Sequence, residues 1–417
     1  MMTAIASILV FSLLVLVHEY GHFRAAKKAG IKIFEFAIGM GPVIHTWQKN
    51  ENETKYSLRL LPIGGFVSME GEDDSDSDMS SESNYNNKTP WQRFKVIIAG
   101  PMMNFLLAIF IYILISAIYG NAGTTIDILD ENSELYKAGV RTEDKILSVN
   151  NDKVYIWDDL IYQITNDEKP YSVEIERNGE TLEFDVNQYY RKLIGISFIS
   201  ENEKFTNEVN VPQNGSAAYD AGMRTGDVIM KINGENVRDA YEIKDEISSS
   251  QSNTLNVEIN REGEVLNYDI ELKNSLSLGF NTKIEKSLVT GVVSSVYKTG
   301  YYIKLMFGFI GKLVTGQINS DAVGGPVQVV SMIGESARMG MYSLLNLAAF
   351  ISINLGFMNL LPIPALDGSK ALFIVIEKIR GKRIPVEKEA YVHFAGFVIL
   401  MGLMIVITYK DVVKLFG

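Results

Sequence analysis

Residues 17–23 read Val17-His18-Glu19-Tyr20-Gly21-His22-Phe23, and they indicate both the fold class and the candidate chemistry. Two histidines four residues apart share one face of a helix, so both imidazoles can bind one metal ion while Glu19 exchanges protons. The motif ends an apolar run, residues 4–17, that is interrupted only by Ser7 and Ser12. The stretch therefore predicts a metal site inside a membrane-embedded helix.

Composition supports a membrane protein with a soluble insert. The 417-residue chain is 47% hydrophobic, has a formal net charge of −11 and contains no cysteine. Its apolar residues are concentrated in blocks near both ends, around a polar middle. The acidic balance argues against a nucleic-acid partner, because phosphate binding needs clustered Lys and Arg. The lack of cysteine excludes disulfides, thiolate catalysis and cysteine-bound zinc.

Four stretches are predicted to cross the bilayer: residues 1–25, 96–118, 342–377 and 391–409. Basic residues at 24, 27, 28 and 32 follow the first stretch and none precedes it, so its carboxyl end is expected at the cytoplasmic side. The basic residues 378–383 orient the third stretch in the same way, which places both termini outside. Without a basic leader or a small-residue cleavage site, the first stretch is expected to be a retained helix rather than a signal peptide.

The segment 26–95 is predicted to contain a hairpin and a loop on the cytoplasmic side. Polar and apolar residues alternate over Lys55–Leu60, as in a half-buried strand, and Pro62, Gly64 and Gly65 then interrupt the pattern. An amphipathic hairpin lying against or dipping into the leaflet fits this pattern. Residues 70–88 are acidic and rich in Ser and Asn, which predicts a flexible loop. Calcium binding by residues 73–78 is disfavoured, since the spacing and glycine of an EF-hand loop are absent.

The middle of the chain is an internal repeat. The segment Ser133–Asn150 returns as Ser216–Asn233, 83 residues later, and Ile194-Gly195-Ile196 matches Leu278-Gly279-Phe280. Two small α+β domains are therefore expected in tandem, over residues 119–199 and 200–282. Residues 283–341, amphipathic and dotted with glycine, predict interfacial helices.

The two copies resemble bacterial PDZ domains, most closely through Gly226-Asp227 and Ile232-Asn233-Gly234 of the second copy. This resemblance implies that extended segments bind by strand addition. A spacer that limits the size of what reaches the membrane is an equally weighted alternative. The first copy has Glu143 and Asn151 where glycine is usual, which predicts less regular turns there.

A third metal ligand must come from outside the opening motif. Catalytic zinc keeps three protein ligands and one open position. His45, in the strand-rich segment, and His393, at the start of the last span, are not placed beside the motif by any pattern. Asp367 lies in an apolar block, where a carboxylate is costly unless it has a partner such as a metal ion. We therefore predict Asp367 as the third ligand and Glu19 as the general base.

The second span contains the motif Gly100-Pro101-Met102-Met103-Asn104. An amide inside hydrocarbon is costly unless it faces protein, so Asn104 is expected to have a partner. For this residue a helix-packing role is favoured over a catalytic one.

Taken together, these motifs resemble the site-2 protease (M50-type) family of intramembrane zinc metalloproteases, and in particular its bacterial members with tandem PDZ domains, which cleave anti-sigma factors. The motifs that carry the resemblance are His18–His22, Gly100–Asn104 and Asn359-Leu-Leu-Pro-Ile-Pro-Ala-Leu-Asp-Gly368, with residues 62–67 resembling the family's membrane-associated β-loop. The resemblance covers nearly the whole chain. It departs at Ser369-Lys370, where glycine and a histidine or arginine are frequent.

The resemblance implies a polytopic α-helical membrane protein with four transmembrane helices, a membrane-associated β-hairpin and two extracytoplasmic PDZ-like domains. It implies a bacterial cytoplasmic (inner) membrane location, with the active site near the cytoplasmic side. It also implies Zn²⁺ held by His18, His22 and Asp367, with Glu19 as the catalytic acid/base. The residues that it assigns to substrate binding are Asn354, Asn359, Pro362, Pro364, Gly64 and Gly65.

Two functional hypotheses follow. The first is a monomeric endopeptidase, in contact with membrane lipid, that cuts single-span proteins already trimmed on their outer side. Anti-sigma factors and remnant signal peptides are the expected substrates. The second is a non-proteolytic membrane scaffold that binds unfolded envelope proteins through its PDZ pair. Glu19→Gln separates the two, because cleavage would vanish while binding persists.

Overall fold

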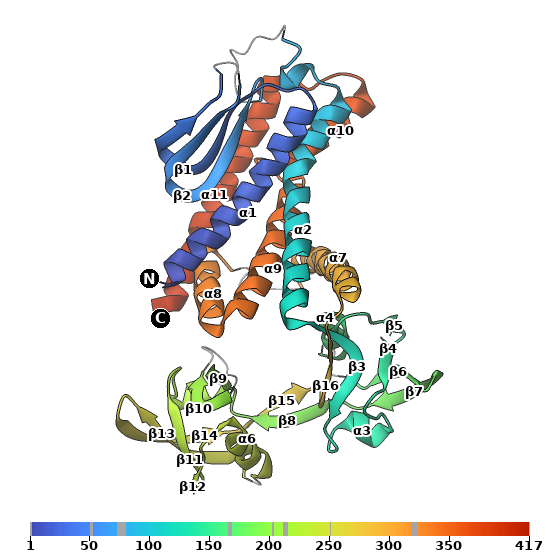
Figure 1. Ribbon diagram of the computed structural model, residues 1–417, viewed down its shortest axis with the longest axis vertical. Helices are drawn as coiled ribbons and strands as arrows, with labels where there is room; N and C mark the ends of the chain where they lie inside the picture. Colours follow the sequence, from blue (N-terminus) through green and yellow to red (C-terminus); the bar gives the residue numbers. More distant parts are fainter. Residues whose placement is uncertain are drawn as a thin grey trace. The chain divides into compact units, whose positions relative to one another are not determined.

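The computed structural model describes residues 2–50, 53–72, 81–165, 169–201, 204–211, 216–250, 252–317 and 324–416. The chain divides into two compact units (Figure 1). Met1–Asn121 and Glu285–Gly417 form the first, here called the helical unit, and Ala122–Ile284 form the second, the repeat unit. In sequence, the repeat unit is an insertion into the helical unit.

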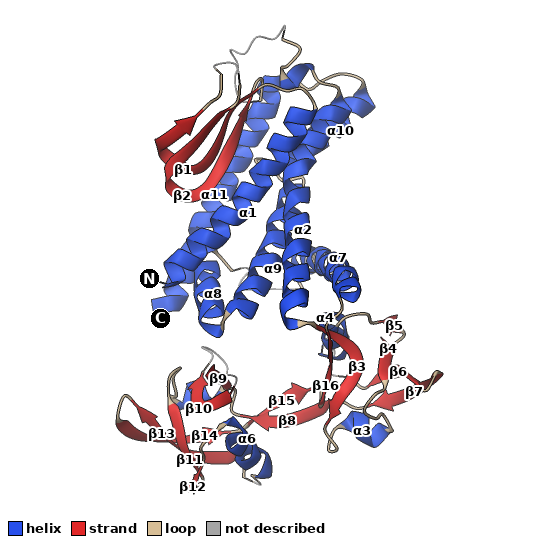
Figure 2. Cartoon of the chain, in the orientation of Figure 1, coloured by secondary structure: helices blue, strands red, loops and turns tan. Residues whose placement is uncertain are grey.

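Long apolar helices make up the helical unit. In the described part, four are long and apolar enough to cross a bilayer: α1 (Met2–Lys28), α2 (Pro90–Tyr119), α9 (Met341–Leu360) and α11 (Val386–Phe416). Both α1 and α9 pack against α2 (Figure 2). Side chains such as Leu14, Phe105 and Ile353 form the shared core of these helices. This core arranges α1, α2 and α9 around the candidate site.

The prediction of one helix over residues 342–377 is wrong. Helix α9 ends at Leu360, and a separate helix, α10 (Asp367–Arg380), begins after the segment 361–366. Pro362 and Pro364 lack the backbone N–H that a continuing helix needs. Asp367 consequently begins a helix instead of lying inside one.

Two further helices, α7 (Leu288–Val314) and α8 (Pro326–Met339), occupy the region in which interfacial helices are predicted. Helix α7 packs against α2 and α9 with one face. The start of α8 is bound by Asp411 of α11, a buried carboxylate that accepts hydrogen bonds from the backbone N–H groups of Gly325 and Gln328. A carboxylate in this position satisfies N–H groups that have no partner within the helix.

The hairpin consists of β1 (Ile33–Trp47) and β2 (Lys55–Met69). Both strands bend. Residues 36–38 of β1 therefore pair with two parts of β2, residues 65–67 on one side and residues 56–58 on the other. At the bend Gly39 has a φ of +87°, a conformation that residues with a side chain rarely adopt. The hairpin lies along α1, and the part beyond the bend exposes large apolar side chains, including Ile44 and Leu60.

The prediction of a flexible loop over residues 70–88 is wrong for the part that the structure describes. Tyr85 is buried, and the short 3-10 helix Tyr85–Asn87 is capped by the side chain of Asn84. Glu70 is also buried and accepts hydrogen bonds from Ser81 and Ser83. Partners that lie apart in sequence order this stretch, and composition alone does not reveal them. Residues 73–80, which include the acidic run 73–78, lie outside the described residues.

The repeat unit contains two domains, one for each copy of the repeat and each built on a six-stranded sheet. The strand order is β16-β3-β4-β6-β7 in domain 1 and β14-β13-β11-β10-β9 in domain 2, with β5 and β12 paired to β4 and β11. A core of buried aliphatic side chains lies in each domain. The elements are β3 (Asn121–Leu129), α3 (Glu134–Ala138), β4 (Lys145–Val149), β5 (Asp152–Lys153), α4 (Trp157–Thr165), β6 (Tyr171–Arg177), β7 (Glu180–Val186), β8 (Tyr189–Leu193), β9 (Ser197–Glu201), β10 (Lys204–Asn210), α5 (Ala217–Ala221), β11 (Val228–Ile232), β12 (Glu235–Asn236), α6 (Ala240–Ser249), β13 (Thr254–Arg261), β14 (Glu264–Glu271), β15 (Lys273–Ser277) and β16 (Phe280–Glu285).

The two domains exchange a strand. Although β16 follows domain 2 in sequence, it pairs with β3 of domain 1, whereas β9 from the end of the first repeat pairs with β10 of domain 2. The intervening strands β8 and β15 pair with each other. Phe280 is accordingly buried in the core of domain 1, and Ile194 in the core of domain 2. The expected division into consecutive domains, 119–199 and 200–282, differs from the structure at both of these segments.

Corresponding turns of the two repeats have the same conformation despite different residues. Glu143 and Asn151 have φ values of +72° and +67°, where the second repeat has Gly226 at +96° and Gly234 at +88°. The prediction of less regular turns in domain 1 is therefore wrong. A non-glycine residue in this region costs roughly 1–2 kcal/mol, which the surrounding sheet offsets.

A buried aspartate anchors the same turn in each domain. Asp144 accepts two hydrogen bonds from Arg177 at 2.6 and 2.7 Å, and Asp227 accepts two from Arg261 at 2.7 and 2.8 Å. These hydrogen bonds raise the pKa of both arginines. The Gly-Asp pattern of the second repeat thus reflects a buried ion pair.

Replacing Phe280 with alanine should loosen domain 1 and leave domain 2 intact. Removing a buried phenylalanine costs about 3–5 kcal/mol, and this side chain belongs to the core of domain 1. Hydrogen-exchange mass spectrometry of the full-length protein should show faster exchange over residues 121–165. Ile284→Ala is the matched control, because Ile284 lies on the same strand but is 66% exposed. Equal loss of protection over residues 216–250 would contradict the strand exchange.

Candidate metal centre

Two histidines of α1 lie on one face of the helix. His18 and His22 are both buried, and their Nε2 atoms are 3.2 Å apart. Residues four positions apart are neighbours on a helix surface. One helix therefore holds two nitrogen donors together without help from the rest of the chain.

Asp367 joins this pair from a distant part of the sequence. Its Oδ2 atom lies 3.1 Å from His18 Nε2 and 3.3 Å from His22 Nε2. One donor atom from each residue lies within 4.8 Å of the other two. In the described part of the chain, no other group of three His, Cys, Asp or Glu donors meets in this way.

The donor set fits a zinc ion. Two imidazole nitrogens and a carboxylate oxygen are common ligands of catalytic zinc, which keeps three protein ligands and one open position. His22 presents the correct atom, because its Nδ1 lies 2.9 Å from the carbonyl oxygen of Val96 on α2. Donation from Nδ1–H to this oxygen leaves the Nε2 lone pair directed at Asp367 and His18.

Asn104 of α2 makes the corresponding contact with His18. It is completely buried, and its side-chain Nδ2 lies 3.1 Å from His18 Nδ1. A neutral imidazole that presents Nε2 to a metal carries its proton on Nδ1, which needs an acceptor. The amide satisfies this need when Oδ1 faces Nδ1, an orientation reached by a half-turn of the amide group. The half-turn also gives a partner to Oδ1, which otherwise has none among the described residues.

The sequence argument favours a packing role for Asn104, and the structure adds a contact with a candidate ligand. The four-residue spacing of Gly100 and Asn104 is the sequence signal that could have predicted this contact, because it places both residues on one face of α2. A Cβ on Gly100 would lie 2.2 Å from His22 Nε2, so Gly100 and Asn104 face successive histidines of α1. Gly21 is equally constrained, since its Cβ would lie 2.3 Å from the Ala99 carbonyl oxygen. These glycines allow α1 and α2 to approach closely.

Glu19 directly follows His18 and is half buried. It lies close enough to His18, His22 and Asp367 for their charges to act on it. The charge of Glu72, just after β2, also acts on Glu19. Glu72 forms an ion pair of 2.8 Å with Lys370, which lies one turn after Asp367. No sequence pattern links Glu72 to Lys370, because 298 residues separate them.

The predicted substrate-binding residues lie around the centre without joining it. Asn354 of α9 is exposed, and Asn359 is half buried. No hydrogen bond connects either amide to the three donors within the described residues. Pro362 is exposed and Pro364 half buried in the segment before Asp367. Of the hairpin glycines, Gly64 lies beside Val15, one turn before the His-Glu motif, and a Cβ on Gly65 would lie 2.6 Å from the Ala37 carbonyl oxygen.

The other two histidines are not part of the donor group. His45 is exposed on β1, where its ring stacks near Trp47. His393 of α11 accepts a hydrogen bond of 3.0 Å from the backbone N–H of Ala365, two residues before Asp367. The sequence provides no signal for this contact.

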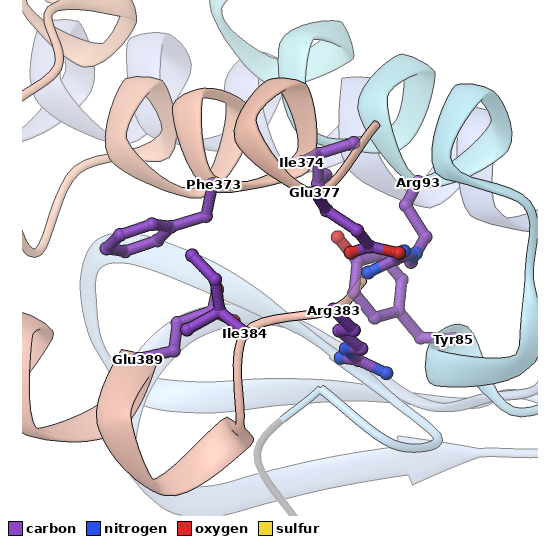
Figure 3. Close-up of a pocket in the computed structure, with 8 residues that line it drawn as sticks. All are labelled: Tyr85, Arg93, Phe373, Ile374, Glu377, Arg383, Ile384 and Glu389. Carbon is purple, nitrogen blue, oxygen red and sulfur yellow. The ribbon is translucent and has the colours of Figure 1, made fainter. Parts of the chain in front are cut away.

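A small cavity lies beside α10 on the side of its carboxyl end (Figure 3). Arg93 of α2 and Glu377 of α10 form an ion pair there, at 2.5 Å, with both side chains largely buried. Phe373 and Glu389 also line the cavity. The ion pair connects α10, which carries Asp367, to α2, which contacts both histidines.

Comparison with known proteins places these residues in a wider context. The model of peptidase family M50 matches residues 6–403. The regulator of sigma-W protease RasP of Bacillus subtilis is 33% identical, over 99% of each chain. The zinc metalloprotease RasP of Bacillus licheniformis is 33% identical over the full length of both chains, and that of Geobacillus kaustophilus is 31% identical over 99% of this chain and 98% of its own.

Proposed function

This chain belongs to peptidase family M50 and is a zinc metalloprotease of the site-2 type, and we propose that it is an intramembrane endopeptidase for single-span membrane proteins. The observation that carries this proposal is the meeting of His18, His22 and Asp367 beside Glu19. Both histidines lie on a helix that is long and apolar enough to cross a bilayer. A hydrolytic centre in this position acts on peptide bonds at membrane depth.

In this proposal His18, His22 and Asp367 hold Zn²⁺. When bound, the ion supplies a Lewis acid that polarises the scissile carbonyl and acidifies water. His22 donates to Val96, and His18 donates to Asn104 Oδ1 once the amide has made its half-turn, so both Nε2 lone pairs are directed at the centre. Glu19 takes a proton from the attacking water and delivers it to the leaving amine nitrogen.

A transmembrane substrate must unwind before water can attack it, because the helix shields its peptide bonds. We propose that the hairpin near Gly64 and Gly65 pairs with the unwound segment by strand addition. The sheet contains only β1 and β2 in the described part of the chain, so residues 65–69 have a neighbouring strand on one side only. The nearness of Gly64 to Val15, whose Cγ1 would lie 3.6 Å from a Cβ on Gly64, supports this role, because Val15 is one helical turn before Glu19.

Asn354 and Asn359 are proposed to bind backbone groups of the extended substrate. An exposed amide on an apolar helix is costly in hydrocarbon, so a peptide group of the substrate is a suitable partner for Asn354. Pro362 and Pro364 are proposed to line the same path, since they shape the segment between Asn359 and Asp367. The positions of these residues on α9 and just after it support the assignment.

The protein is proposed to lie in the bacterial cytoplasmic (inner) membrane, with its active site near the cytoplasmic side and the repeat unit outside. Basic residues end both α1, at Lys27 and Lys28, and α10, at Lys378 and Arg380. Side chains near these two ends share one core, which includes Phe23 and Ile374. Clustered positive charge at one end of the bundle supports a cytoplasmic location for that end.

Pre-trimmed anti-sigma factors and remnant signal peptides are the proposed substrates, and the protein is proposed to act as a monomer. The name of the Bacillus subtilis relative, a regulator of sigma-W protease, supports the first class. The repeat unit is proposed to exclude proteins with large outer domains. A non-proteolytic scaffold is the alternative, but it would not need the three converging donors.

Two single-span model substrates test this proposal. They share one transmembrane segment and carry either a short outer tail or a folded outer domain. Purified protein in liposomes should cut the short form, and cleavage of the long form should be at least tenfold slower. Equal cleavage of both would contradict the size filter, whereas cleavage of neither, with binding retained, would favour the scaffold.

A further inference from the structure

The chain reaches Asp367 through a tight turn over residues 363–366. The backbone N–H of Leu366 bonds to the carbonyl oxygen of Ile363 at 3.1 Å. Pro364 occupies the second position, where its ring sets φ near −65°. Ala365 occupies the third, with φ of +76°. These values define a type II turn, which favours glycine at the third position because a Cβ there is strained.

His393 of α11 holds this turn in its strained form. Its Nδ1 accepts a hydrogen bond of 3.0 Å from the Ala365 N–H. In the relaxed type I alternative the peptide between Pro364 and Ala365 is rotated by roughly half a turn, which directs this N–H elsewhere. The bond to His393 therefore exists only in the type II form and favours it.

The imidazole packs against Phe373, while its buried Nε2 has no hydrogen-bond partner among the described residues. To accept at Nδ1, a neutral ring carries its proton on Nε2, which lies 3.9 Å from Glu389 Oε1. The ring of Phe373 meets the His393 ring edge to face, with centroids 5.7 Å apart. Phe373 and Glu389 are both visible beside the cavity in Figure 3.

One turn further along α11, the helix touches the same loop. A Cβ on Gly396 would lie 2.2 Å from Pro364 Cβ and 2.9 Å from the Pro364 carbonyl oxygen. His393 and Gly396 are three residues apart and therefore share one face of α11. This face contacts the turn at both of its central residues.

We propose that His393 is a positioning residue, which holds the left-handed turn at Ala365 and thereby sets the direction in which the chain enters Asp367. The proposal rests on the proposed role of Asp367 as a zinc ligand. It assigns a function to a histidine that is not itself a ligand. It also gives a role to this second attachment of α11, which Asp411 joins to α8 elsewhere along the helix.

The test compares three replacements of His393 by their effect on zinc affinity and on cleavage. His393→Ala should weaken Zn²⁺ binding about 10- to 100-fold, as loss of a residue that orients a metal ligand typically does. Asparagine places its Oδ1 near the position of Nδ1, so His393→Asn should bind zinc within about threefold of the unmodified protein. Glutamine extends its acceptor toward the position of Nε2, and His393→Gln should resemble His393→Ala. Zinc affinity is measured by chelator competition on the full-length protein.

A double replacement separates this role from simple packing. Glycine favours the third position of a type II turn, so adding Ala365→Gly to His393→Ala should restore most of the zinc affinity. Phe394→Ala is the control for helix packing, because Phe394 is the next residue and is 67% exposed. Failure of both His393→Asn and Ala365→Gly to restore affinity would overturn the proposal. If Asp367→Asn also left zinc affinity unchanged, the proposed metal site itself would be wrong.

Discussion

Replacing Glu19 with glutamine should slow cleavage of a pre-trimmed single-span substrate by about 10²- to 10⁴-fold while zinc remains bound. Glutamine has nearly the shape of glutamate but cannot accept and return a proton at neutral pH. His18, His22 and Asp367 are untouched by the change, so the donor group should stay intact. Initial cleavage rates in liposomes and zinc content per protein molecule check both parts of this expectation.

Glu180→Gln provides the matched control, because Glu180 is an exposed residue of β7 in the repeat unit. This variant should cleave at the unmodified rate. A Glu19→Gln protein that retained both zinc and full activity would exclude Glu19 as the proton carrier. Loss of zinc from the same variant would instead assign Glu19 to the ligand set. Substrate captured but not cut by Glu19→Gln would also identify physiological partners.

Replacing Asp367 with asparagine should weaken zinc binding by more than about 100-fold and remove activity. Loss of a direct ligand should exceed the 10- to 100-fold effect typical of a residue that only orients one. Asparagine preserves the size of the side chain, so the start of α10 should keep its packing. The charge is lost, however, and two imidazoles alone leave the ion without its anionic ligand.

Chelator competition and metal analysis of the full-length protein measure this loss. Asp152→Asn is a suitable control, since Asp152 is an exposed residue of β5. Retention of zinc affinity by Asp367→Asn would require another third ligand. Hydrogen exchange over α10 shows whether the helix stays folded, so loss of metal can be distinguished from loss of structure.

Much of the helical unit could be predicted from sequence, because its signals are local. Apolar runs of sufficient length indicate α1, α2, α9 and α11, and the basic residues at their ends suggest an orientation. Residues 342–377 were predicted as one span, and only the structure shows that α9 ends at Leu360 and that α10 is a separate helix. A proline ends a helix, but whether a new helix begins after it depends on how the following residues pack.

The repeat was visible because both copies keep the same residues at the same spacing. The exchange of β9 and β16 was not, because a strand pattern predicts an extended segment but not its neighbour. Either partner would satisfy the backbone hydrogen bonds of these strands. In the structure, β8 and β15 pair with each other between the two domains, and Phe280 of β16 is buried in the core of domain 1. Both features depend on residues that are distant in sequence.

Local periodicity alone establishes that His18 and His22 face the same way, since a four-residue step returns nearly to the same side of a helix. The cost of burying a carboxylate in an apolar block similarly pointed to Asp367. Tertiary packing alone decides that Asn104 faces His18, that Val96 bonds to His22, and that His393 holds Ala365. These contacts join residues 28 to 86 positions apart on different elements. No spacing rule connects such residues, because their distance is set by how the helices pack against one another.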